Sequence, residues 1–340
     1  MIKDCKKRLE KICQILKKKN TKQYNNIKCV ILLDLVKFYN EEIKNPDKFL
    51  LRFYYFLSNK IKEYENDIKF LEKKIKKYSF KKSYPFSAGK HYGILFDDFD
   101  NKSIFEEPYQ LLKKRFNRNK INIKNFKNKT AIDLGCGNGR YTFALKKFGF
   151  KKVVGIDISK KNINNAKKHK IKNVFFYTGD ILNLNFIKER FDFVFSYGVF
   201  HHTRSISKCF KEMFKIMKKN SSGFVFLIGA GGIRWLIINI MRKILLNISP
   251  NYIYKFFKGC GFTNKKIFLI LDHILVPINK LTTPNEIEKI FKKNKIKYFK
   301  RCKRGSDFDD IERIFKIKSI SKKKKFEIFG HGENRYFFKL

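Results

Sequence analysis

The pattern of apolar and polar positions divides the chain into helical and alternating parts. Apolar residues recur at helical spacing in residues 5–16, 27–38 and 49–75, and the break before the last of these falls at Asn45-Pro46-Asp47. We therefore predict a helical accessory region over residues 1–80. The polar face of its last segment alternates Lys and Glu, as a solvated helix would.

Residues 81–340 show a different pattern and are predicted to form a second domain. Short apolar runs alternate with helical segments over residues 130–229, which predicts an α/β fold with a parallel sheet wound on both faces. Strands are expected at 131–134, 152–157, 173–177, 191–195 and 224–228. Residues 297–299 and 335–338 suggest a sixth and a seventh strand within a C-terminal part, residues 295–340.

An unusually apolar segment, residues 231–271, follows the fifth expected strand. Its apolar residues, together with Arg234, Arg242 and Lys243, leave two readings open. The first is a packed helical lid, which we favour. The second is an apolar lid that receives a lipophilic or membrane-borne substrate by peripheral contact with a lipid surface. Further along, Thr283-Pro284-Asn285-Glu286 has the sequence of a capped helix start.

Composition adds a large positive charge. The chain has 340 residues, a formal charge of +48 and 43% hydrophobic residues, enough to bury a core. Because lysine is spread over every segment, base-composition bias explains it better than a dedicated polyanion groove, although non-specific polyanion binding at low salt is expected. The seven cysteines form no cluster with metal-ligand spacing, so we expect reduced thiols, a cytoplasmic protein and no metal. No apolar run is long enough for a transmembrane segment.

Candidate chemistry begins at the turn after the first expected strand. The motif Asp133-x-Gly135-x-Gly137-x-Gly139 places three glycines between a strand and a helix, where a ligand can lie against the main chain. A second strand ends at Asp157, at the spacing where a carboxylate can accept hydrogen bonds from ribose hydroxyls. The spacing differs from the Gly-x-Gly-x-x-Gly typical of nicotinamide-binding folds.

The order of four motifs makes the resemblance to a family specific. After the glycine turn and Gly155-x-Asp157 come Gly179-Asp180 and then the segment Gly198-Val-Phe-His201-His202. In this order the chain resembles class I S-adenosylmethionine-dependent methyltransferases, and among them the small-molecule enzymes with a Gly-x-x-His-His segment after strand 4. The resemblance implies a Rossmann-like doubly wound seven-stranded sheet whose last strand is antiparallel, with S-adenosyl-L-methionine as cofactor.

The resemblance also implies roles for individual residues. Asp133 orients the glycine turn and the methionine amino group, while Gly135, Gly137 and Gly139 allow close approach of the cofactor. Asp157 takes the ribose hydroxyls, and Ile158 packs on the adenine. The remaining implied cofactor contacts are Asp180 and Ile181 at the adenine and Ser196 at the methionine end.

Residues near the acceptor are less well defined. His201 and His202 follow strand 4 at the ligand-binding edge, where one of them could act as a base or position the substrate. His91 and Tyr92 lie in a turn-rich segment, residues 83–93, that folds over the cofactor in many enzymes of the resembled family; an ordinary packed loop is the alternative.

The acceptor, the methylated atom and the oligomeric state do not follow from the sequence. We expect a small-molecule or lipophilic acceptor, methylated at oxygen. The alternatives are an RNA methyltransferase and a catalytically silent scaffold that acts through the N-terminal helices. No Asn-Pro-Pro-Tyr or Asp-Pro-Pro-Tyr tetrapeptide follows strand 4, and this absence counts against methylation of exocyclic base amines.

Overall fold

The computed structural model describes residues 2–19, 21–41, 46–75, 88–96, 99–245, 248–303, 321, 323, 326 and 329–340. These residues divide into two compact units. One unit combines residues 1–86 with 233–275, and the other combines residues 87–232 with 276–340. The chain leaves the second unit after Gly232 and returns to it at Val276.

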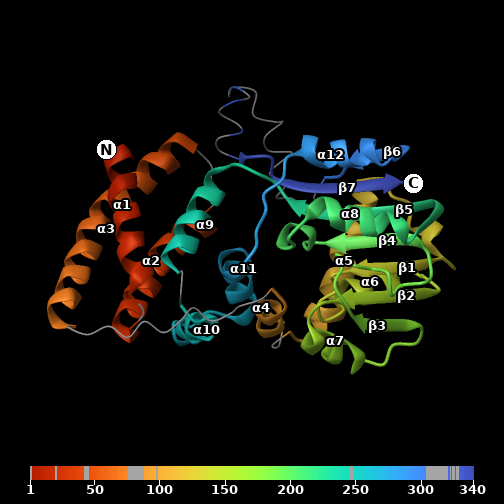
Figure 1. Cartoon of the computed structure of the whole chain (residues 1–340), viewed down its shortest axis with the longest axis horizontal. Helices are drawn as coiled ribbons and strands as arrows, with labels where there is room; N and C mark the ends of the chain where they lie inside the picture. The colour runs from red at the N-terminus through yellow and green to blue at the C-terminus, as the bar shows by residue number, and fades with distance from the viewer. Residues whose placement is uncertain are drawn as a thin grey trace. The chain divides into compact units, whose positions relative to one another are not determined.

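The second unit is built on a seven-stranded sheet in the order β3-β2-β1-β4-β5-β7-β6, which Figure 1 shows edge to edge. The strands are β1 (Thr130–Leu134), β2 (Lys152–Asp157), β3 (Val174–Thr178), β4 (Phe191–Tyr197), β5 (Met217–Ile228), β6 (Tyr298–Arg301) and β7 (Glu333–Lys339). Strands β1 to β5 are parallel, and β7 runs antiparallel between β5 and β6. The predicted fold class, with an antiparallel last strand, is confirmed.

Helices cover both faces of the sheet. On one face lie α5 (Glu107–Arg118), α6 (Arg140–Lys147) and α7 (Lys160–Lys167), which bury Phe116, Ala144 and Ile163, respectively. On the other lie α8 (Ile206–Lys215) and α12 (Pro284–Lys293), with Phe210 and Phe291 in the core. The predicted capping box is present, since Thr283 Oγ1 accepts from the backbone N–H of Glu286 and the Glu286 side chain accepts from that of Thr283.

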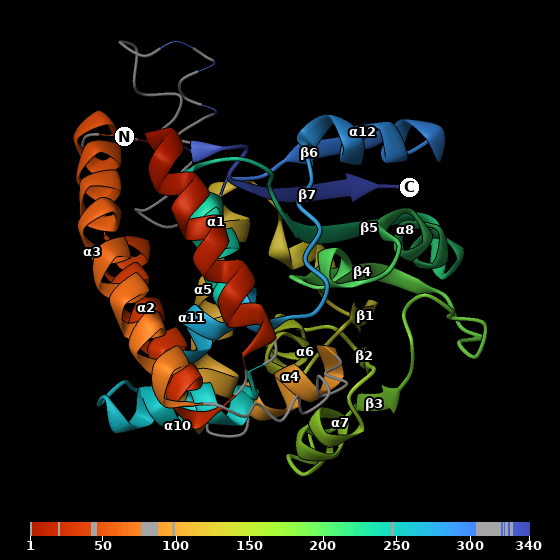
Figure 2. The ribbon, with the colours of Figure 1, turned by 60° about the vertical axis from the view of Figure 1, so that its left-hand side comes forward.

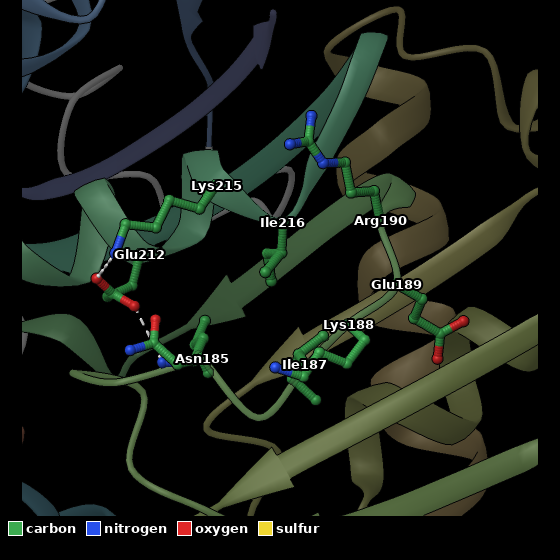
Figure 3. A pocket seen from close by; sticks show the side chains of 9 residues that line it. Asn185, Ile187, Lys188, Glu189, Arg190, Glu212, Lys215 and Ile216 are labelled. Carbon is green, nitrogen blue, oxygen red and sulfur yellow. Dashed lines mark hydrogen bonds and ion pairs between the residues drawn. The ribbon is translucent and has the colours of Figure 1, made fainter.

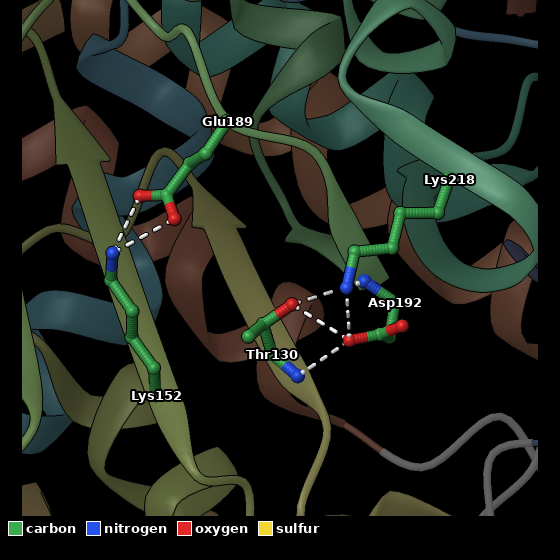
Figure 4. Close-up of polar contacts among 5 residues, drawn as sticks. All are labelled: Thr130, Lys152, Glu189, Asp192 and Lys218. Carbon is green, nitrogen blue, oxygen red and sulfur yellow. Dashed lines mark hydrogen bonds and ion pairs between the residues drawn. The ribbon is translucent and has the colours of Figure 1, made fainter.

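The amino-terminal ends of three strands are joined by one carboxylate. Asp192 Oδ2 accepts hydrogen bonds from the backbone N–H and hydroxyl of Thr130, at 2.9 and 2.8 Å, and from Lys218 Nζ at 2.9 Å (Figure 4). These contacts tie the starts of β1, β4 and β5 together. The predicted fifth strand, 224–228, is too short, because the polar start of β5 pairs with β4 through an irregular register.

The secondary structure of the first unit, over its described residues, is helical. It contains α1 (Ile2–Lys18), α2 (Lys22–Asn40) and α3 (Pro46–Lys74), together with α9 (Ile233–Ile244), α10 (Pro250–Gly259) and α11 (Asn264–Leu275). Helices α1, α2 and α3 lie side by side (Figure 2), and α9 packs against both α1 and α2. The inserted helices therefore share a core with the N-terminal helices.

The apolar residues that suggested a lid for a lipophilic substrate are buried in this shared core. On α9 the side chains of Ile233, Ile237, Ile238, Met241 and Ile244 are buried. Arg242 donates a hydrogen bond of 2.7 Å to the carbonyl of His273 on α11, so it too serves contacts inside the unit. Among the described residues, no helix combines the length and apolarity needed to cross a bilayer.

Candidate functional site

The glycine turn lies at the carboxyl end of β1, at the point in the sheet where the strand order reverses between β1 and β4. Ligands bind at this position in open parallel sheets. Gly135, Gly137 and Gly139 have φ angles of +82°, +54° and +90°, which residues with a Cβ rarely adopt. The turn is fixed to β2, because the N–H groups of Gly135 and Cys136 both donate to the carbonyl of Ile156, at 2.7 and 2.9 Å.

At each of the three glycines, a side chain of this chain occupies the direction in which a Cβ would project. A Cβ on Gly135 would lie 2.4 Å from both γ-carbons of Val199, and one on Gly139 would lie 2.9 Å from rings of Phe143 and Phe176. A Cβ on Gly137 would lie 3.0 Å from the ring of Phe96. The glycines are therefore required for the packing of the turn as well as for its backbone conformation.

Asp157 links the ends of β1 and β2. Its Oδ2 accepts from the N–H of Gly137 at 2.9 Å, and its Oδ1 accepts from the N–H of Ser159 at 2.8 Å. Burial raises the pKa of this carboxyl, and the two backbone donors oppose that rise. Each carboxylate oxygen keeps a second lone pair, so Asp157 retains the capacity to accept from a ligand hydroxyl. Ile158, the next residue, is 59% exposed and leaves an apolar surface open beside it.

Asp133 lies beneath the turn and is buried. Thr142 Oγ1 on α6 donates a 2.7 Å hydrogen bond to its Oδ2. Burial raises the pKa of Asp133 to about 7, the hydrogen bond from Thr142 lowers it, and the negative charge of Asp157 raises it further. A cation bound nearby would favour the ionised form of both carboxyls.

The other predicted cofactor residues differ in their surroundings. Asp180 is exposed, and its Oδ1 accepts from the N–H of Leu182 at 2.9 Å, which closes a turn after β3. Ile181 is only 6% exposed, and its side chain belongs to the core. A ligand could therefore contact its main chain but not its side chain. Ser196 Oγ donates to the carbonyl of Leu134 at 2.8 Å and holds the end of β4 against β1.

The histidine segment follows β4 as a short helical turn, Phe200–His202. Val199 brings it onto the glycine turn, as described above. Both imidazoles are buried, and their centroids lie 4.0 Å apart. The segment is also held by the chain that returns from the inserted helices, since Lys280 N–H donates to the carbonyl of His201 at 2.8 Å.

The tautomer of His202 follows from its backbone partner. Its Nδ1 lies 2.9 Å from the carbonyl oxygen of Ile278. A carbonyl can only accept, so Nδ1 must carry the proton. In the neutral ring, Nε2 is then the unprotonated nitrogen. The sequence did not distinguish the two histidines, and Ile278, 76 residues away, could not be identified as the partner from sequence alone.

A helix lies over this part of the site. Residues 83–93 were predicted to be turn-rich; 83–87 lie outside the described residues, and 88–93 belong to helix α4 (Ala88–Leu95), so the prediction is wrong for that part. Gly89 approaches Ile158 and Gly93 approaches the Ser159 hydroxyl, which explains why glycines occur in this helix. Small residues here let α4 pack closely on the start of α7.

An aromatic row connects α4 to both the glycine turn and the histidines. The ring of Tyr92 lies 5.9 Å from that of Phe96 and 5.6 Å from that of His202. His91 is buried, with its ring 5.0 Å from Tyr92. Phe96, which covers Gly137, was missed in the sequence because it follows no motif. The structure thus brings together Tyr92, Phe96, the glycine turn and the histidine segment.

Comparison with known proteins identifies the family that the centre of this unit resembles. Residues 125–228 match a family model described as a methyltransferase domain. Ubiquinone biosynthesis O-methyltransferase of Pelagibacter ubique is 35% identical over 104 residues, which cover 30% of this chain and 43% of that protein. tRNA U34 carboxymethyltransferase of Campylobacter curvus is 33% identical over 109 residues, which cover 30% of this chain and 35% of that protein.

The chain thus spans less than half the length of both relatives. Among solved structures, PKMT2 from Rickettsia typhi in complex with AdoHcy matches 69% of this chain and 53% of that chain, at 18% identity and a TM-score of 0.43. A TM-score this low gives no further support for the fold. The strand order of the sheet defines the fold by itself. The chain contains a class I S-adenosylmethionine-dependent methyltransferase domain, centred on residues 125–228.

Proposed function

We propose that this chain transfers a methyl group from S-adenosylmethionine to an oxygen of a small-molecule or lipophilic acceptor. One observation carries the proposal: the glycine turn, Asp157 and the histidine segment converge at the switch point of the sheet, with Val199 packed directly on Gly135. S-adenosylmethionine, when bound, supplies a methyl group already activated on a sulfonium. The residues of the chain therefore need mainly to align the acceptor and exclude water.

The residues around the turn fit such a cofactor. Asp157 is proposed to accept from ribose hydroxyls with its remaining lone pairs, and exposed Ile158 to pack on the adenine. Asp180 has one oxygen in a local turn and is proposed to accept from the adenine amino group with the other. Asp133, buried with a pKa of about 7, favours a positively charged ligand above it. Tyr92 and Phe96 are proposed to shield the site from water.

His202 is proposed as the acceptor's base. With Nδ1–H held by the carbonyl of Ile278, its Nε2 is free of a proton in the neutral ring and can take one from a hydroxyl. We expect His202→Gln to lower kcat by roughly 10²- to 10⁴-fold with unchanged cofactor affinity. His201→Gln is the matched comparison and should retain more activity. Equal losses in both variants would contradict the assignment of His202.

RNA is the second acceptor class. The similarity to a tRNA U34 carboxymethyltransferase over 109 residues favours it, whereas the similarity to a ubiquinone biosynthesis O-methyltransferase favours a lipophilic hydroxyl compound. Transfer of labelled methyl from S-adenosylmethionine separates the two. Lipophilic phenols and total tRNA are offered to the full chain in parallel, and incorporation only into tRNA would reject the small-molecule acceptor.

Cofactor binding is tested first by calorimetry. S-adenosylmethionine and S-adenosylhomocysteine are titrated into the full chain and into Asp157→Ala. We expect Asp157→Ala to weaken binding by more than about tenfold, or roughly 1.4 kcal/mol. If the folded wild type binds neither compound, or if the variant binds as tightly as the wild type, the proposed site is wrong.

A further inference from the structure

An exposed row of aromatic rings lies along β3, the strand at one edge of the sheet. Phe175 and Tyr177 are 42% and 46% exposed, while Phe176 between them points to the opposite face and is buried. Phe186, from the loop that follows, is 45% exposed, and its ring covers Gly179, the next position on the same face as Phe175 and Tyr177. Three rings thus follow one another along a single face.

This exposure is not a simple consequence of the abundance of phenylalanine. The chain has 38 phenylalanines, and among the described residues only Phe70, Phe175, Phe186 and Phe326 are exposed. Two of these four belong to the row on β3. A contiguous exposed apolar patch usually marks an interaction surface.

Cations lie beside the three exposed rings of Phe175, Tyr177 and Phe186. Lys152 Nζ lies 5.3 Å from the centroid of the Phe175 ring and 2.8 Å from each carboxylate oxygen of Glu189 (Figure 4). The neighbours of Glu189, Lys188 and Arg190, are exposed and make no hydrogen bond or ion pair within the described part of the chain. Glu189 is therefore paired, and Lys188 and Arg190 remain for a ligand. The other acidic residue of this loop, Asp180, lies at its far end, after β3.

Lys188 and Arg190 also line a hollow of about 370 Å³ between the loop and the end of α8 (Figure 3). From α8 come Lys215 and the buried Glu212, whose carboxylate accepts from Lys215 and from the N–H of Leu184 at 3.0 Å. Both acidic residues that line the hollow, Glu189 and Glu212, are thus paired within the protein. The hollow presents mainly positive charge to solvent.

Further positive charge lies near this hollow, at the end of the sheet where the parallel strands begin. Exposed cations occur where the chain enters β1 to β5, at the amino-terminal edge: Lys127, Lys129, Lys151, Lys167, Lys168, Lys170, Lys172, Lys188, Arg190, Lys215 and Lys219. The opposite, carboxyl ends of the strands also carry exposed cations, among them Lys160, Lys161, Arg204 and Lys208, and Asp133 there is buried. Charge at the strand ends therefore attracts a polyanion without selecting one end of the sheet, and the exposed rings beside Lys188 and Arg190 make that selection.

We propose that the face of β3, with Phe175, Tyr177, Phe186, Lys188 and Arg190, binds single-stranded RNA. Unpaired bases stack on the three rings, and phosphates meet the cations of the loop. Positions two apart on a strand are separated by about 6.6 Å, so Phe175 and Tyr177 can hold neighbouring bases. A duplex offers no exposed base faces to such a row. The proposal goes beyond the proposed function, because it concerns docking and not the methylated atom.

Binding is tested on the full chain by fluorescence anisotropy of a labelled 12-nucleotide polyuridine strand, without cofactor. We expect Phe175→Ala/Tyr177→Ala to weaken binding at least tenfold, since stacking on each ring contributes about 1–3 kcal/mol. Phe70→Ala is the matched control: Phe70 is 57% exposed and has Lys74 Nζ 4.8 Å from its ring, but lies on α3. This control is expected to bind as the wild type does.

The charge contribution is tested separately. Lys188→Ala/Arg190→Ala should weaken binding and flatten its salt dependence between 50 and 200 mM salt by about two counterions. Lys62→Ala/Lys69→Ala removes the same charge from α3 and should change binding less. Urea unfolding reports whether each variant is folded, and failure of S-adenosylhomocysteine binding in the wild type would concern only the proposed function.

Two results would overturn the proposal. The first is unchanged polyuridine affinity in the folded Phe175→Ala/Tyr177→Ala variant, which would leave only diffuse charge attraction. The second is equal or tighter binding of a 12-base-pair RNA duplex, or of phosphatidylserine vesicles, with the same loss in the aromatic variant. That outcome would assign the surface to a duplex or to a membrane.

Discussion

Asp133 connects the stability of the protein to pH in a way that can be measured without cofactor. Its carboxyl is 2% exposed, and burial raises its pKa from the ordinary 3.8 to about 7. Because the pKa is higher in the folded protein, the protonated form is the one that folding favours. The stabilisation is complete below about pH 4 and is lost as the pH rises toward 7.

The size of the effect follows from the two pKa values. Between pH 5 and pH 8 the ionisation of one carboxyl with these values costs about 2 to 3 kcal/mol of the free energy of unfolding. Asp133→Asn removes the titration while its side-chain oxygen can still accept from Thr142. The difference in stability between wild type and Asp133→Asn should therefore shift by that amount across this range, in favour of the variant at high pH.

Urea unfolding at half-unit steps from pH 5 to pH 8 measures this difference. Subtracting one protein from the other cancels the titration of the groups that do not interact with Asp133. Asp180→Asn serves as the control, because Asp180 is an exposed carboxylate at the same sheet edge, and it should follow the wild type. A wild-type curve parallel to that of Asp133→Asn over the whole range would show that Asp133 is not held protonated, and the reasoning would fail.

Further expectations follow from the same geometry. S-adenosylmethionine should bind more tightly as the pH rises from 6 to 8, and S-adenosylhomocysteine, which lacks the sulfonium charge, should show a weaker trend; calorimetry at several pH values measures both. Gly135→Ala should destabilise the fold by about 2–4 kcal/mol, from the left-handed φ and the clash with Val199, and Val199→Ala in the same chain should restore part of that loss in urea unfolding. Thr283→Ala removes the cap of α12 and should cost about 1 kcal/mol in the same assay. Deleting residues 1–80 should expose the apolar face of α9 and cause aggregation in light scattering, whereas deleting 233–275 as well should reduce it.

The sheet was predictable where buried strands carry their signal in local sequence. β2 has the predicted limits, since Lys152–Asp157 is an apolar run that ends in a carboxylate. β5 begins at Met217, seven residues before the predicted start, because its first half is polar and forms by pairing with β4 and β7. The register is fixed by partners distant in the chain, and a local pattern cannot report them.

The site was predictable to a similar extent. Asp133, Asp157 and the glycines follow from a motif, and the structure places them together at one end of the sheet. Phe96, Val199 and Ile278 were not predicted, because their contribution depends on which atoms they reach across the fold. Helix α4 was missed for a related reason: Gly89 and Gly93 lower helix propensity locally, but they allow the close approach to α7 that stabilises the helix in place.

The charge distribution shows how topology can create a pattern that is absent from the sequence. Lysines occur in every segment, so no stretch of sequence indicates a polyanion site. In a parallel sheet, however, every strand begins at the same edge, and each preceding helix ends there, where cations are also favoured by the helix dipole. The lysines before β1 to β5 therefore converge at the edge where these strands begin. Helix ends explain Lys167 and Lys168, but not Lys188 and Arg190, which lie in a loop beside the exposed rings of β3. That local coincidence of unpaired cations and aromatic rings, more than the net charge, is what supports a docking surface.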